Sequence, residues 1–199
     1  QDEQLAVFIP MAYNVGGYTI IVPRSCTRNL DMKPAEALQL TLSGGLGSSK
    51  ATGKPLATLA SEWLWEPLQA KNDALWHLDH DGGMERAYCC FNSNARDFAR
   101  FGKLMVHQGN WNGTQILDSS FVSLATKGTF ESYYGYSFWI DPDRGTPVFA
   151  QHGILGQYII SMPEKNLVVV RLGNHDLGDA PNQHTNDFNV IVDEVLKMY

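Results

Sequence analysis

Short apolar runs rich in β-branched residues lie at both ends of the chain. Residues 5–10 and 18–23 each end at a proline, and the asparagine- and glycine-containing segment 14–17 separates them. This arrangement predicts an N-terminal β-hairpin. Near the other end, similar runs predict three successive strands, which cover residues 147–150, 157–161 and 167–172.

Between these runs, apolar residues recur at helical spacing. Residues 95–107 follow Asn94, a favourable N-cap residue with Asp97 three positions on, and a glycine comes after the segment. The same kind of pattern predicts further helices over residues 34–40, 55–68, 119–125 and 185–199. The order of elements predicts an α/β fold of the α+β type, in which an antiparallel sheet built from both chain termini is covered by helices.

The length suits one sizeable domain or two very small ones, and we expect residues 1–199 to form a single domain. The glycine- and serine-rich segment 41–49 is the best candidate for a linker. No charged-then-apolar leader precedes Gln1, so we expect a processed, trimmed or fragmentary chain.

Composition narrows the classes of function. With 44% hydrophobic and 18% charged residues, the chain has a globular and not a disordered composition. Its net charge of −6, with scattered basic residues, argues against a nucleic-acid partner or an anionic membrane surface. No apolar run approaches the ~20 residues of a membrane span.

The three cysteines, Cys26, Cys89 and Cys90, form no CxxC pattern and cannot all pair with one another, so a disulfide scaffold is not expected. We interpret the adjacent Cys89 and Cys90 as small buried apolar side chains. A different chemistry is open at His77, Asp79 and His80, because imidazole and carboxylate groups at this spacing can bind zinc.

Several segments together resemble the β-lactamase-related serine hydrolases, the class C β-lactamase-like group that includes esterases, D-aminopeptidases and 6-aminohexanoate-dimer hydrolases. The resemblance extends over residues 46–199, and it is carried by residues 51–56, 88–102, 109–117 and 152–173. It implies a β-lactamase/transpeptidase-like fold whose helical domain is incomplete here. Residues 24–50 are the expected place of the missing or shortened helical segments.

The resemblance also implies site residues. Members of the family use a Ser-x-x-Lys nucleophile motif, a tyrosine or serine proton shuttle, and a Lys-Thr-Gly-like or His-x-Gly-like triplet on an edge strand. His152 and Gly153 stand where that triplet is expected, and Ser25 to Arg28 stand where the nucleophile motif is expected, directly after the second strand. Arginine replaces lysine at position 28, and a guanidinium cannot act as a general base near neutral pH.

Two elements of the family pattern are missing. The sequence contains no Ser-x-x-Lys, and residues 41–45 hold no tyrosine where the shuttle is expected. Fewer than thirty residues separate Ser25 from Gly53, where the family has a long helical segment. Either part of the helical domain is not in this sequence, or the chain is a shortened relative that lacks catalytic groups.

The resemblance therefore implies hydrolysis of a small-molecule ester or amide, with β-lactams among the candidates, through an acyl-enzyme and without a metal or organic cofactor. Activity would be weak or absent if these residues are the whole chain. The alternatives are a catalytically inactive binding or sensor domain and the zinc site at His77, Asp79 and His80. The compartment and the oligomeric state are undecided, although the resemblance suggests a periplasmic or secreted protein.

Overall fold

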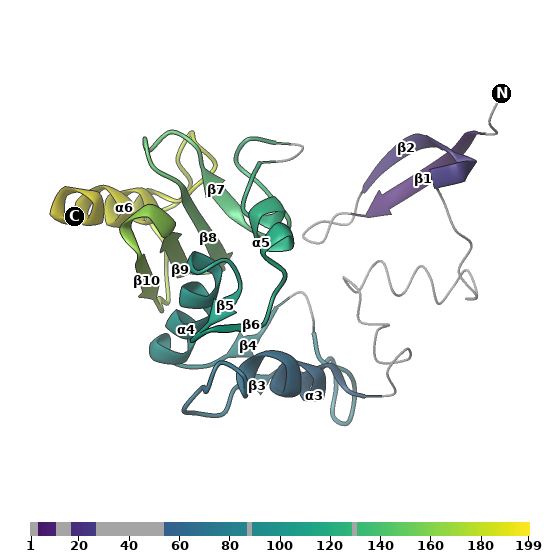
Figure 1. The fold of residues 1–199 in the computed structure, drawn as a ribbon, viewed down its shortest axis with the longest axis horizontal. Helices are drawn as coiled ribbons and strands as arrows, with labels where there is room; N and C mark the ends of the chain where they lie inside the picture. Colours follow the sequence, from purple (N-terminus) through teal and green to yellow (C-terminus); the bar gives the residue numbers. More distant parts are fainter. Residues whose placement is uncertain (1–3, 11–16, 27–53, 87–88, 129–130) are drawn as a thin grey trace. The chain divides into compact units, whose positions relative to one another are not determined.

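The computed structural model describes residues 4–10, 17–26, 54–86, 89–128 and 131–199 (Figure 1). The chain divides into two compact units, each described by itself below: Gln1–Ser61 with Leu75–Asn92, and Glu62–Ala74 with Ser93–Tyr199. Among the described residues, no helix combines the length and the apolar character that a bilayer crossing requires.

The first unit contains the expected N-terminal hairpin. Strand β1 (Gln4–Pro10) pairs antiparallel with β2 (Gly17–Pro23), and the 3₁₀ turn η1 (Arg24–Cys26) follows directly. The unit also contains helix α3 (Leu56–Ala60) and a short antiparallel pair, β3 (Leu75–Trp76) and β4 (Phe91–Asn92). Shortly before β4, Cys89 and Cys90 form a disulfide with each other. The expectation of two inert apolar side chains is therefore wrong: adjacent cysteines bonded to each other are not free thiols packed as small hydrophobes.

The helix predicted over residues 55–68 is shorter and changes its type. It begins as α3, becomes the π-helical turn η2 (Ser61–Trp65) and then ends in turns. The amide of Ala70 donates to the carbonyl of Trp65 at 3.1 Å. Pro67 accounts for the early end, because proline has no N–H to donate and disfavours helical backbone at the residue before it.

The second unit is built on a four-stranded antiparallel sheet with the order β10-β9-β8-β7 (Figure 1). Its strands are β7 (Trp139–Asp141), β8 (Val148–Gly153), β9 (Gln157–Met162) and β10 (Leu167–Arg171). The 3₁₀ turn η3 (Pro163–Lys165) joins β9 to β10. The three predicted C-terminal strands are therefore confirmed, and β7 is an addition that the sequence pattern did not reveal.

Helices cover both faces of this sheet. The C-terminal helix α6 (Asn186–Met198) packs Phe188 and Val192 against the face that carries Val148, Ala150 and Ile160. Helices α4 (Ala95–Val106) and α5 (Ser119–Ala125) contribute to a second core around Phe149 on the opposite face. The alternation of inward positions along β8 follows from the two-residue period of a strand.

Helix α4 lies unusually close to the sheet at one glycine. A Cβ atom on Gly102 would lie 2.5 Å from Cγ1 of Val168 and 2.9 Å from Cγ2 of Ile159. Any side chain at this position would push the helix away from β9 and β10. A short antiparallel pair of strands, β5 (Asn110–Trp111) and β6 (Thr114–Gln115), follows α4.

The predicted mixed α/β fold with antiparallel pairing and helical cover is therefore confirmed. The hairpin β1–β2 forms a sheet of its own within the described residues, so the union of both chain ends in one sheet stays a prediction. So do the single domain over residues 1–199 and the missing segments at 24–50. The helix expected at 34–40 and the linker at 41–49 lie outside the described residues.

Candidate functional site

The predicted His152–Gly153 pair lies at the end of β8. Pairing between β7 and β8 runs from Asp141 opposite Val148 to Trp139 opposite Ala150, whereas β8 continues to Gly153. On its other side this end of β8 remains paired with β9. Among the described residues, the last part of β8 therefore extends past its neighbour and leaves backbone groups on that edge without a strand partner. Such an edge can pair with an extended ligand.

His152 is held in a cluster of aromatic rings. Its imidazole centroid lies 4.7 Å from the ring of Phe188, 5.0 Å from that of Tyr158, 5.2 Å from that of His184 and 5.4 Å from that of Trp139. These rings come from β7, β9, α6 and the residue two positions before α6. The cluster fixes the orientation of His152 and, through it, the backbone at the end of β8.

Burial in this cluster changes the acid–base behaviour of His152. Desolvation, with a smaller contribution from the nearby His184 ring, lowers the pKa of His152 to about 3, although the charge of Asp187 opposes the shift. Its Nε2 atom is buried and has no hydrogen-bond partner among the described residues. The same burial disfavours the charged imidazolium form of His152.

Gly153 is required by its cross-strand neighbour. It lies opposite Gln157, and a Cβ atom at position 153 would come within 2.8 Å of the Gln157 Cβ. The Gln157 side chain is itself engaged, because its Oε1 accepts from the Gly173 amide at 3.1 Å and its Nε2 donates to the Gly173 carbonyl. Gly153 is exposed, and it lies opposite a glutamine that is bonded to the Gly173 backbone.

A polar network of Tyr158, Asp187 and Arg171 adjoins the aromatic cluster around His152. The Tyr158 hydroxyl donates to the Asp187 carboxylate, with oxygen–oxygen distances of 3.0 and 3.1 Å, and the Arg171 guanidinium lies 3.1 Å from the same carboxylate. Burial raises the pKa of Tyr158, so the hydroxyl remains a donor. Burial would also raise the pKa of Asp187, but hydrogen bonds from Thr185 and Tyr158 outweigh it and lower that pKa. The result is a charged, paired anchor at the start of α6.

The sequence-predicted nucleophile lies in the other unit. Ser25 is exposed in η1, immediately after β2. Arg28 lies outside the described residues, as do residues 41–45, where the proton shuttle was expected. The structure thus brings His152 and Gly153 together in one strand, whereas Ser25 belongs to a separately described unit.

The carboxylate of the proposed zinc site, Asp79, is hydrogen-bonded within its own loop. Oδ1 of Asp79 accepts from the Met84 amide at 2.8 Å and from the His80 amide at 2.9 Å. Among the described residues, no group of three histidine, cysteine or carboxylate side chains is placed to hold a metal ion. Hydrogen bonding within the loop explains the Asp79 carboxylate without a ligand.

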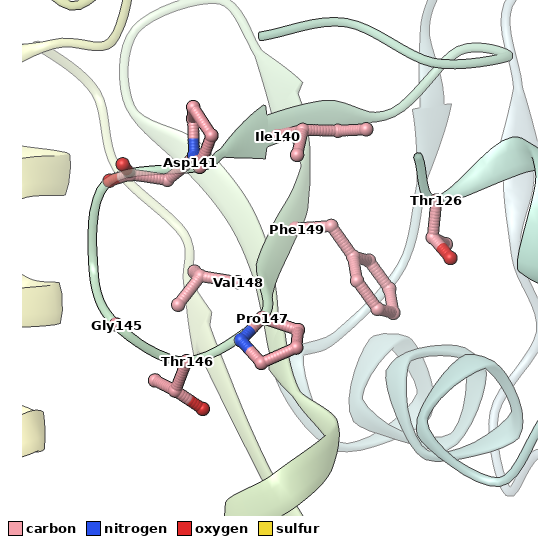
Figure 2. Close-up of a pocket in the computed structure, with 9 residues that line it drawn as sticks. Thr126, Ile140, Asp141, Gly145, Thr146, Pro147, Val148 and Phe149 are labelled. Carbon is pink, nitrogen blue, oxygen red and sulfur yellow. The ribbon is translucent and has the colours of Figure 1, made fainter. Parts of the chain in front are cut away.

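A pocket of about 290 Å³ lies at the opposite end of β8 from His152 (Figure 2). The β7–β8 loop forms much of it, and Ile140, Phe149 and Thr126 complete its wall. Its buried carboxylate, Asp141, already accepts from Nε of Arg144 at 2.6 Å. The pocket therefore contains none of the residues that the sequence marked, and its acidic group is paired.

Sequence reasoning missed the groups that hold His152 in place. The contacts of Trp139, His184 and Asp187 depend on how β7 and α6 pack against the rest of the sheet. The N-cap of α6 gave a local signal, because Oγ1 of Thr185 accepts from the Phe188 amide at 3.4 Å.

Comparison with solved structures places this architecture. A protein assigned as a 6-aminohexanoate-dimer hydrolase from Bacillus anthracis matches 90% of the chain with a TM-score of 0.64 and 23% identity. A protein assigned as a β-lactamase from Bacteroides dorei DSM 17855 matches 75% of the chain with a TM-score of 0.58 and 18% identity. The matches cover 45% and 53% of those proteins, so the chain spans about half their length.

No protein-family model and no curated protein sequence matches the chain. The structural matches are below 25% identity and speak for the fold. The chain therefore has the fold of the β-lactamase-like hydrolases, and at that level the resemblance seen in the sequence is confirmed.

Proposed function

We propose that this chain is part of a serine hydrolase that cleaves a small-molecule ester or amide through an acyl-enzyme. The observation that carries the proposal is the open end of β8 at His152 and Gly153, in a sheet with the β-lactamase-like fold. In this reaction the Ser25 hydroxyl oxygen forms a bond to the carbonyl carbon and the bond from that carbon to the leaving oxygen or nitrogen breaks. The hydroxyl proton ends on the departing alcohol or amine. Water then hydrolyses the acyl-serine.

Backbone donors supply the charge stabilisation in this scheme. The tetrahedral intermediate carries a negative oxygen, and preorganised N–H groups stabilise such an oxygen strongly in a site that excludes water. The donor that the second unit offers is an amide at the end of β8 near Gly153. The Gly153 backbone is exposed, and this edge of β8 has no strand partner among the described residues.

His152 acts as a positioning residue in this proposal. Its pKa of about 3 and its enclosure by aromatic rings disfavour proton transfer at neutral pH. Fixing β8 against α6 holds the oxyanion donor in place, and small displacements of such donors are costly in rate. A guanidinium stays protonated near neutral pH, so Arg28 does not act as the base for Ser25.

The test uses hydrolysis of p-nitrophenyl acetate by the full chain. Ser25→Ala is expected to reduce the rate to the uncatalysed background, because the attacking oxygen is removed. Ser119→Ala, at an exposed position at the start of α5, is the matched control and is expected to retain the wild-type rate. Equal activity of Ser25→Ala and wild type would exclude Ser25 as the nucleophile.

A binding or sensor domain is the second candidate, and Arg28 in place of a lysine base favours it. In that case the wild-type chain releases no p-nitrophenol above background. A ligand of the site would then still raise the melting temperature in proportion to its occupancy.

A further inference from the structure

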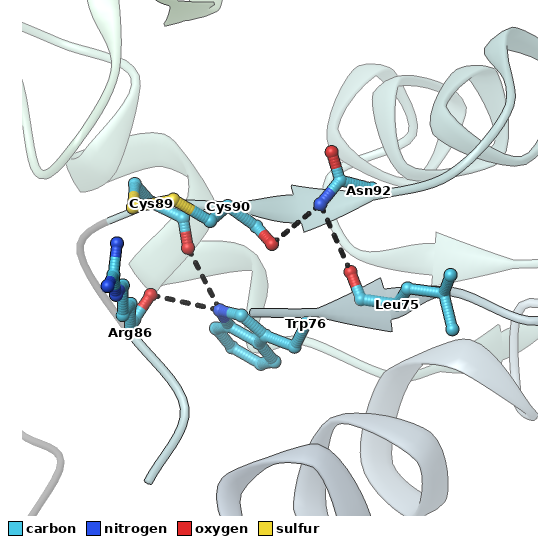
Figure 3. Close-up of a disulfide and its surroundings, with 6 residues drawn as sticks. All are labelled: Leu75, Trp76, Arg86, Cys89, Cys90 and Asn92. Carbon is cyan, nitrogen blue, oxygen red and sulfur yellow. Dashed lines mark hydrogen bonds between the residues drawn. A yellow bond between two sulfur atoms is a disulfide. The ribbon is translucent and has the colours of Figure 1, made fainter. Parts of the chain in front are cut away.

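The disulfide between Cys89 and Cys90 joins neighbouring residues (Figure 3). In the chain-entropy account, a disulfide stabilises a fold by closing a loop, and the effect grows with the number of residues enclosed. A bond between neighbours encloses almost no chain. Its effect therefore falls on the backbone of the two cysteines themselves, because it closes a small ring that includes their shared peptide bond.

The backbone of Cys90 lies in the left-handed region, with φ of +71°. Residues with a Cβ atom avoid this region because the Cβ approaches the following carbonyl oxygen. Strand β4 begins at the next residue, so the left-handed turn sets the direction in which the chain enters the strand. The ring formed by the disulfide holds Cys90 in this conformation.

The carbonyl groups of both cysteines are bound by other residues of the same unit. The Cys90 carbonyl accepts from the His77 amide at 3.1 Å and from Nδ2 of Asn92 at 2.8 Å. The Cys89 carbonyl accepts from Nε1 of Trp76 at 3.0 Å (Figure 3). A change in the backbone at the cysteine pair would therefore reorient the acceptors that hold the end of β3.

The β3–β4 pair is also bonded to the chain just before the two cysteines. Nε1 of Trp76 donates to the Arg86 carbonyl at 2.9 Å, and the Cys89 amide donates to that carbonyl at 3.0 Å. The Trp76 ring packs edge-on against Phe91, with 5.1 Å between centroids. The cysteine pair thus belongs to a small hydrogen-bond network around the β3–β4 pair.

We propose that Cys89–Cys90 is a reversible redox site that sets the conformation of the β3–β4 segment. A dithiol reductant transfers two electrons and two protons: the sulfur–sulfur bond breaks, two thiols form, and the reductant becomes a disulfide. Both cysteines are only half-buried, which gives a small thiol access to the bond. Without the ring, Cys90 leaves the left-handed region and its carbonyl turns away from the His77 amide.

The first test measures the cysteines and the His77 amide in the full chain. Before reduction, iodoacetamide labels neither Cys89 nor Cys90, and after dithiothreitol it labels both, as mapped by peptide mass spectrometry. Reduction is expected to speed hydrogen exchange at the His77 amide by about five- to thirty-fold, the ratio that matches the cost of a left-handed residue. Full labelling of both cysteines before reduction would overturn the proposal.

A pair of double variants separates the ring from other effects of losing sulfur. Cys89→Ala with Cys90→Gly removes the ring but allows left-handed backbone, so exchange at His77 should stay within about twofold of the oxidised chain. Cys89→Ala with Cys90→Ala removes the ring and does not allow left-handed backbone easily, so exchange at the His77 amide should match that of the reduced chain. Equal exchange in the two variants, or in the oxidised and reduced chain, would show that the disulfide does not control this backbone.

Discussion

Asp97 carries the most heavily hydrogen-bonded carboxylate described in the structure, and its removal tests the architecture of the second unit. It is 1% exposed in the first turn of α4. Oδ1 accepts from the Lys71 amide at 2.9 Å and from Nε of Arg100 at 3.2 Å. Oδ2 accepts from the Asn72 amide and side chain, both at 3.0 Å, and from Nδ2 of Asn94 at 2.7 Å.

Asp97→Asn preserves the shape but replaces one acceptor oxygen with a donor. In the less damaging orientation the new NH₂ group occupies the Oδ1 position, where it faces the Lys71 amide and the Arg100 guanidinium. An unsatisfied buried donor costs about 1–3 kcal/mol. Loss of the bond to the charged Arg100 guanidinium adds a similar amount, which is reduced because Arg100 is partly exposed to solvent. We expect the free energy of unfolding to fall by about 2–4 kcal/mol.

Urea denaturation followed by circular dichroism at pH 7 measures this loss, and Asp118→Asn is its control. Asp118 caps α5 from an exposed position through the amides of Ser120 and Phe121, and asparagine caps a helix as well as aspartate does. The control should therefore leave the unfolding midpoint unchanged. An Asp97→Asn midpoint equal to that of Asp118→Asn would refute the role assigned to the buried carboxylate.

The same variant gives a pH signature. Burial would raise the pKa of Asp97, but hydrogen bonds from Lys71, Asn94 and Asn72 outweigh it and hold the pKa well below its usual 3.8. A lowered pKa in the folded state means that the ionised carboxylate stabilises the fold above about pH 4, and that this contribution is lost as the pH falls further. The stability difference between wild type and Asp97→Asn should therefore narrow steadily below pH 4. A difference independent of pH would contradict the shift.

Three further predictions concern the site. Arg28→Lys should raise the rate at which Ser25 is acylated by an activated ester, by up to about 10²- to 10⁴-fold, because lysine can accept a proton; no increase in a stopped-flow burst would argue against this role. Tyr158→Phe should lower the free energy of unfolding by about 1–3 kcal/mol, since the Asp187 carboxylate loses a buried donor, and an unchanged urea midpoint would contradict the network. Gly153→Ala should destabilise by about 1–3 kcal/mol and reduce hydrolysis, because its methyl carbon would lie 2.8 Å from the Cβ of the residue opposite; wild-type stability and activity would show that the strand has room there.

Local signals in the sequence were sufficient for the helices of the second unit. The cap of α4 is Asn94, whose Oδ1 accepts from the Arg96 and Asp97 amides, and that pattern can be read from neighbouring residues. Helix α6 could be predicted for the same reason, since its apolar positions recur at helical spacing behind Thr185. Both helices carry their own start signal and their own apolar face.

Elements that depend on distant partners could not be predicted. Strand β7 is three residues long, and it exists because Trp139–Asp141 pairs with a strand that follows a loop. The π-helical turn at Ser61–Trp65 was also not predicted, because the apolar spacing there is that of an ordinary α-helix. The aromatic enclosure of His152 requires rings from α6 and β9, and no spacing along the chain reveals it.

Only part of the candidate site could be predicted, because some of its features depend on residues distant in the sequence. The position of His152 and Gly153 at a strand end follows from the local pattern, whereas the neutral state of His152 follows from tertiary burial. Sequence analysis therefore located the strand end, whereas the rings packed around His152 could not be predicted from it. Ser25 was placed directly after β2, and its turn is present there.

The identity of the nucleophile is the central claim, and covalent labelling tests it most directly. The full chain is treated with a fluorophosphonate, which phosphonylates activated serines, and the adduct is mapped by tandem mass spectrometry of peptides. The account predicts one adduct, on Ser25, and none in Ser25→Ala. An adduct on a different serine, or an unmodified chain under conditions that label a known serine hydrolase, would contradict it.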